Sequence, residues 1–88
     1  EVPVLLEFFT EWDEGSTTMH PVLKDVAAAL GDKAKVIKID VEKNHELADA
    51  LRIKGVPTLI IYKSGEMKWR QNGEEDANTL IGRLQEYV

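Results

Sequence analysis

Apolar residues along the chain follow two spacings, and these spacings predict strands and helices in turn. The nearly continuous apolar run at residues 2–9 is typical of a central strand covered on both faces. Over residues 16–30 the apolar positions recur every three or four residues and Gly31 follows, which predicts an amphipathic helix. Pro21 removes one backbone donor inside this helix, so we expect a kink near His20.

A second strand followed by a short helix is predicted next. Residues 35–41 have the composition of a strand, and Asn44 can cap a helix that continues to Leu51. Leu47 and Ala48 share the apolar face of that helix with Leu51. Because a helix separates this strand from the first one, the two are expected to pair in parallel through a right-handed crossover.

The last third of the chain predicts a hairpin and a final helix. Residues 58–62 and 66–71 flank a short Lys-Ser-Gly connection of the kind that joins antiparallel strands. Asp76 or Asn78 then begins a helix. Its predicted buried stripe consists of Ala77, Leu80, Ile81, Leu84 and Val88. The element order is βαβαββα, which predicts an α/β fold with a mixed four-stranded sheet flanked by helices, in a single domain spanning residues 1–88.

Charge and composition exclude several classes of partner. The 88 residues include 11 Lys and Arg against 16 Asp and Glu, for a formal net charge of −5. This balance repels phosphate backbones and anionic lipid headgroups, so neither nucleic acid nor a membrane surface is an expected partner. The apolar runs are too short to span a bilayer. We therefore expect a soluble monomer, with the compartment left open and the cytoplasm slightly favoured.

Four separately placed markers resemble one known family. Residues 4–12, which end in Trp12, are similar to the strand that leads into the active site of thioredoxins, and Pro21 matches the proline in the following helix. The Gly-Val-Pro-Thr segment around Pro57 resembles the cis-proline loop, and Gly73 matches a glycine beside the active site. The resemblance covers essentially the whole chain. It implies a thioredoxin-like fold, here without the strand and helix that precede this core in full-length members.

The resemblance places the two redox cysteines of the family at Asp13 and Ser16. The chain contains no cysteine. A carboxylate at the start of a helix retains the favourable interaction with the helix dipole, but it has no sulfur to exchange. A serine hydroxyl is not ionised near neutral pH and cannot resolve a mixed disulfide. We therefore expect no catalytic residue, no cofactor and no insulin-reducing or disulfide-isomerising activity.

Glu7 is a carboxylate within an apolar strand. By resemblance it matches the buried acid that relays protons in thioredoxins, with Lys38 on the neighbouring strand as its partner. If Glu7 is buried, desolvation raises its pKa while Lys38 opposes the rise. The alternative is that Glu7 lies at a solvated edge and has no role.

Trp12, Val56, Pro57 and Gly73 correspond to the family's shallow apolar groove, which receives an extended polypeptide. Such binding does not require sulfur, so a polypeptide in the groove near Trp12 and Pro57 is the expected partner. The structural alternative is that these residues only preserve the fold. The resemblance also predicts a cis peptide bond between Val56 and Pro57.

The sequence contains residues for two further chemistries, a serine hydrolase and a metal site. Ser16 and His20 are four residues apart on a helix, and with Asp13 or Glu14 they would make a hydrolase-like trio. The same carboxylates with His20 and His45 match no recognised metal-ligand spacing, so no metal site is predicted.

Three functional hypotheses remain. The first is a redox-inactive domain that binds polypeptide or acts as an interaction module. The second is a disulfide reductase of cell redox homeostasis whose cysteines were replaced by evolution or by engineering. The third is a purely structural domain.

Overall fold

The computed structural model describes all 88 residues, and its elements follow the predicted order. The strands are β1 (Val4–Phe9), β2 (Lys35–Asp40), β3 (Thr58–Lys63) and β4 (Glu66–Asn72), and the α-helices are α1 (Glu14–Leu30), α2 (His45–Ala50) and α3 (Ala77–Gln85). Two 3-10 turns, η1 (Gly31–Lys33) and η2 (Val41–Lys43), flank β2.

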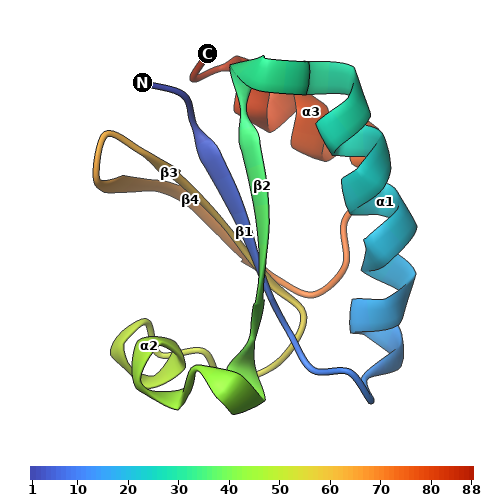
Figure 1. Cartoon of the computed structure of the whole chain (residues 1–88), viewed down its shortest axis with the longest axis vertical. Helices are drawn as coiled ribbons and strands as arrows, with labels where there is room; N and C mark the ends of the chain where they lie inside the picture. Colours follow the sequence, from blue (N-terminus) through green and yellow to red (C-terminus); the bar gives the residue numbers. More distant parts are fainter.

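The four strands form one mixed sheet in the order β2-β1-β3-β4. β1 pairs with β2 in parallel, whereas β1 with β3 and β3 with β4 are antiparallel. Figure 1 shows α1 and α3 together on one side of the sheet and α2 on the other, near the end of the sheet where α1 begins. The predicted α/β fold is confirmed, and β2 is an edge strand with one side unpaired.

The main core lies between the sheet and the helix pair α1 and α3. From the sheet, Leu5, Leu59 and Ile61 pack into it, and all three are fully buried. Helix α1 contributes the stripe Met19, Leu23, Val26 and Leu30, and α3 contributes Leu80 and Leu84. The three-and-four spacing of these residues thus places one face of each helix on the sheet.

Several predicted boundaries were wrong by one or two residues, and three of these differences have a clear local cause. β1 begins at Val4 because Pro3 has no N–H to add to the ladder, although its carbonyl accepts a hydrogen bond from the Lys35 amide. α1 begins at Glu14 because the Asp13 side chain caps it, and the helix continues through Pro21 without interruption. β2 ends at Asp40, whose carboxylate accepts from the Glu42 amide and starts η2.

Three predicted side-chain roles were also wrong. Asn44 occupies the N-cap position of α2, but its side chain donates to the Asp40 carbonyl instead of accepting from the helix. Leu47 is 42% exposed, which leaves Ala48 as the buried residue of that helix. Val88 is 58% exposed because α3 ends at Gln85.

The hairpin connection and the start of α3 agree with the predictions from the sequence. Ser64 and Gly65 both have positive φ, as the two central residues of a type I′ turn require. Asp76 rather than Asn78 caps α3, since its carboxylate accepts from the Thr79 amide at 2.8 Å. No helix in the structure is long and apolar enough to cross a membrane.

Candidate functional site

The candidate site lies where β1 ends and α1 begins. Asp13 is the N-cap of α1, and its Oδ2 accepts a hydrogen bond from the Ser16 amide at 2.8 Å. This bond satisfies one of the unpaired amides of the first helical turn. Asp13 therefore has a structural role at the position where the resemblance places the first cysteine.

Ser16 and His20 do not form the pair that a hydrolase requires. The Ser16 side chain is fully buried, and neither its Oγ nor the buried Nε2 of His20 has a hydrogen-bond partner. The His20 ring instead packs edge-on against Phe9, with ring centroids 5.6 Å apart. A serine without a base has no means of activation, so the hydrolase alternative is wrong.

Glu7 is fully buried in the centre of β1. Both of its carboxylate oxygens lack hydrogen-bond partners. Desolvation raises the pKa of Glu7 from 4.5 to about 7, and the positive charge of Lys38 opposes part of that rise. The chain thus contains a buried carboxyl group with a pKa of about 7 in the centre of the sheet.

Lys38 lies opposite Glu7 in the β1–β2 register, but the two do not form an ion pair. Lys38 is solvent-exposed on the edge strand, whereas the Glu7 carboxylate is enclosed. The ammonium therefore acts on Glu7 through its field and not through a direct bond. Glu7 remains a buried acid without a bonded partner, which is costly when it is ionised.

Pro57, Gly73 and the turn before α1 are brought together in space. The Val56–Pro57 peptide bond is cis. The Gly73 amide donates to the Pro57 carbonyl at 2.7 Å, and a Cβ on Gly15 would lie 3.0 Å from Pro57 Cδ. Gly15 thus allows the proline loop to approach the helix start closely.

The four residues that the resemblance assigns to a binding groove differ in how much surface they present. Trp12 is 72% exposed, Val56 and Gly73 are half-buried, and Pro57 is buried. Neither the N–H nor the C=O of Val56 makes a hydrogen bond within the chain. Trp12, Val56 and Gly73 are therefore accessible to a ligand, whereas Pro57 is not.

Carboxylates surround this surface. Glu11 and Glu14 are exposed on either side of the turn, and a Cβ on Gly15 would lie 3.1 Å from both Asp13 Oδ2 and Glu74 Oε2. Beside Glu74, a cavity of about 380 Å³ lies along α1, lined by Thr18, Met19, Val22, Glu74, Glu75 and Asp76. Sequence reasoning missed this acidic border, although Glu74 and Glu75 directly follow the marker Gly73.

The residues considered for a metal site do not come together. No three His, Asp or Glu side chains are grouped so that they could hold an ion. His45 begins α2, on the other side of the sheet from His20 (Figure 1). The structure therefore does not support the metal alternative.

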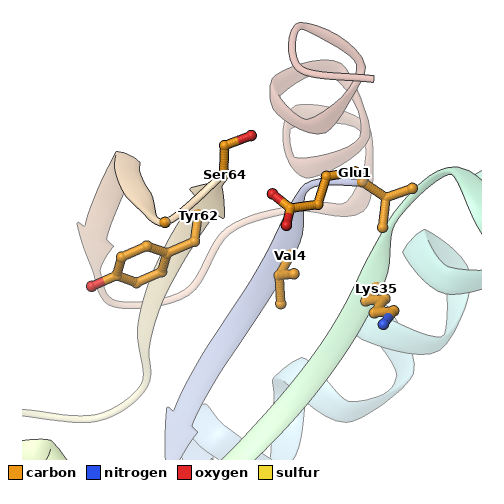
Figure 2. A pocket seen from close by; sticks show the side chains of 7 residues that line it. Glu1, Val4, Lys35, Tyr62 and Ser64 are labelled. Carbon is orange, nitrogen blue, oxygen red and sulfur yellow. The ribbon is translucent and has the colours of Figure 1, made fainter.

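Another cavity of about 380 Å³ lies at the opposite end of the sheet. Val4, Lys35 and Tyr62 line it from three adjacent strands, and Glu1 and Ser64 border it (Figure 2). β1 runs from this cavity at Val4 to the candidate site after Phe9, so the two are separated by the length of the strand. This cavity is not part of the candidate site.

The thioredoxin family model matches residues 1–86 of the chain. The chain belongs to the thioredoxin family. It is 40% identical over 85 residues to the chloroplastic thioredoxin Y of Oryza sativa, a match that covers 97% of the chain and 51% of the rice protein. A thioredoxin-like protein of Synechocystis is 35% identical over 86 residues, covering 98% of the chain and 82% of that relative. The chain thus spans about half the length of its rice relative.

Solved structures agree with this assignment. The structure of thioredoxin-2, described as a component of malaria parasite protein secretion machinery, superimposes with a TM-score of 0.95 at 26% identity. The match covers 98% of the chain and 84% of that protein. This thioredoxin-family domain therefore retains the family's backbone without any cysteine.

Proposed function

We propose that this thioredoxin-family domain is redox-inactive and binds an extended polypeptide at the surface formed by Trp12, Val56 and Gly73. One observation carries the proposal: the exposed Trp12 stands at the turn that packs on the proline loop, where the Val56 backbone has no partner in the chain. The absence of cysteine removes thiol exchange from the same surface.

The physical basis of binding is backbone pairing next to an aromatic contact. An extended polypeptide can exchange hydrogen bonds with the free N–H and C=O of Val56, as added strands do at sheet edges. Trp12 supplies a large apolar face, and tryptophan is enriched among residues that dominate binding energy. The Gly73 amide already donates to the Pro57 carbonyl, so it is not free to donate to a bound polypeptide. Gly73 instead lets the polypeptide approach the backbone closely, because it has no side chain.

The surrounding carboxylates determine which polypeptides bind. Glu11, Glu14 and Glu74 lie around the surface, and the whole chain has a net charge of −5. Electrostatic complementarity favours segments that carry Lys or Arg and disfavours acidic segments. We therefore expect a polypeptide with basic residues beside the apolar ones that contact Trp12.

The test uses two synthetic twelve-residue peptides in which Val and Thr alternate with either Lys or Glu. Binding is measured by calorimetry at low and high salt. The Lys peptide is expected to bind more tightly than the Glu peptide, with a difference that shrinks as salt rises. Trp12→Ala is expected to weaken binding about ten-fold or more, because truncating an aromatic residue that dominates binding typically costs ~2 kcal/mol or more.

The matched control is Met67→Ala. Met67 is an exposed apolar residue on β4, 42% accessible, and its truncation removes similar surface away from the site. Equal losses in the two variants, or no binding of either peptide, would contradict the proposal and favour a purely structural domain.

A further inference from the structure

A second concave site lies on the side of α1 that faces the edge strand β2. Its cavity of about 190 Å³ has an apolar floor of Leu23, Ala27 and Val36. His20 and Lys24 line it from α1, and Lys38 lines it from β2. Because β2 has no neighbour on its outer side, the cavity opens directly at the sheet edge.

The charges at this cavity are unbalanced. The structure contains two ion pairs, Lys68 with Glu66 and Arg83 with Glu86, and neither Lys24 nor Lys38 takes part in one. No carboxylate lines the cavity. In a chain with a net charge of −5, two unpaired ammonium groups beside one apolar pocket form a local positive site.

His20 adds a third polar group, and one of its ring nitrogens has no hydrogen-bond partner in the chain. Its Nε2 is buried and has no hydrogen-bond partner. Burial lowers the pKa of His20, and the charges of Lys38 and Lys24 lower it further, which favours the neutral imidazole. A neutral imidazole can donate one hydrogen bond, and the ring of His20 packs edge-on against Phe9.

We propose that this cavity binds a small aliphatic carboxylate, whose anionic group lies between Lys24, Lys38 and His20 and whose hydrocarbon tail covers Leu23, Ala27 and Val36. The long side chains of both lysines can donate hydrogen bonds to the same carboxylate. The apolar floor can accept a short hydrocarbon tail. The site is separate from the surface at Trp12, since it lies farther along α1 and against a different strand.

Occupancy has a measurable effect on the titratable groups that face the cavity. A bound carboxylate offsets the two ammonium charges, so the pKa of His20 rises toward its ordinary value. Glu7 lies opposite Lys38 on β1 and is influenced by that ammonium, so the same negative charge raises the pKa of Glu7 further. Binding is therefore expected to raise the pKa of His20 and the pKa of Glu7, and the two can be measured separately.

The test is titration of the isotope-labelled chain with sodium hexanoate, followed by NMR at the His20 ring and the methyl groups of Leu23 and Val36. Saturable shifts with a dissociation constant of about 1 mM are expected for a ligand of this size. 1-Hexanol serves as the neutral counterpart and is expected to bind at least five-fold more weakly. The His20 titration midpoint should rise on saturation with hexanoate.

Substitutions distinguish the contribution of the lysine charges to hexanoate binding from that of the cavity's shape. Lys24→Gln and Lys38→Gln should each weaken hexanoate binding about five-fold. Lys35→Gln is the matched control, because Lys35 lies on the same strand but borders the other cavity (Figure 2), and it should change binding less than two-fold. Ala27→Leu fills the floor while keeping every charge, and it should abolish binding.

Three outcomes would overturn the proposal. These are equal affinity for hexanol and hexanoate, equal losses in Lys35→Gln and Lys38→Gln, or shifts that do not include His20. A folded chain that shows no saturable shift up to 50-fold above the expected dissociation constant, about 50 mM, would do the same.

Discussion

The double variant Asp13→Cys/Ser16→Cys will form an intramolecular disulfide and reduce insulin, whereas the unmodified chain will give no turnover above a no-protein control. The two positions are three residues apart at the start of α1, and the Asp13 carboxylate already reaches the Ser16 amide at 2.8 Å. Side chains so placed can meet the geometry of a disulfide. The amides and dipole of the helix N-terminus lower the pKa of a thiol at position 13 and favour its thiolate.

Free-thiol counts before and after oxidation, together with insulin turbidity, measure this result. The single variants Asp13→Cys and Ser16→Cys are the controls, because neither can close an intramolecular bond. A disulfide without activity would indicate a structural domain whose binding surface has been lost. Failure to form any intramolecular disulfide would contradict the assignment of this turn to the family's active site.

Restored activity would also support the hypothesis that this chain derives from a disulfide reductase by loss of its cysteines. The structure retains the buried Glu7, and its pKa of about 7 suits proton transfer near neutral pH. In the double variant, a further Glu7→Gln substitution should therefore lower the insulin rate more at pH 7 than Glu11→Gln, which changes an exposed carboxylate.

Replacing Glu7 with Leu will stabilise the chain above neutral pH and remove most of a pH dependence that the unmodified chain shows. The pKa of Glu7 is about 7 in the folded chain and about 4.5 when exposed. Between these values the folded state holds a proton that the unfolded state has lost, so stability falls as pH rises from 4.5 to 7. At 1.36 kcal/mol per pKa unit, this shift corresponds to a loss of ~3 kcal/mol.

Urea denaturation at pH 5 and pH 8 measures this effect. At pH 8 Glu7→Leu should be ~2 kcal/mol more stable than the parent, and at pH 5 the difference should be much smaller. His20 has the opposite dependence, because its lowered pKa costs stability as pH falls, but this contribution is common to both proteins and cancels in their difference. An unchanged difference between the two pH values would contradict the account of Glu7.

Most of the fold could be predicted because each element has a local signal. The three-and-four spacing from Met19 to Leu30 and the Ser64-Gly65 turn each specify one structure. One error arose where a side chain had two local hydrogen-bonding options. Asn44 could cap α2 or bond to Asp40, and it does the latter, because Asp40 itself turns the chain into η2.

The candidate site was predictable only in part. Asp13, Pro57 and Gly73 could be placed from their order in the sequence, but the burial of Pro57 and the free backbone of Val56 depend on how the loop packs on α1. The cavity beside His20 could not be foreseen, since it needs α1 and β2 side by side. Sequence spacing indicates which residues of one helix or strand share a face. Only the tertiary structure shows which residues of two different elements lie side by side.

The most direct test of the central claim is the amide chemical-shift map of the isotope-labelled chain with carbamidomethylated insulin B chain, an unfolded polypeptide without free thiols. Recognition without redox chemistry predicts saturable shifts confined to Trp12, the turn before α1, Val56 and Gly73, with no change in the covalent state of the B chain. Saturable shifts elsewhere, or none at these residues, would contradict it.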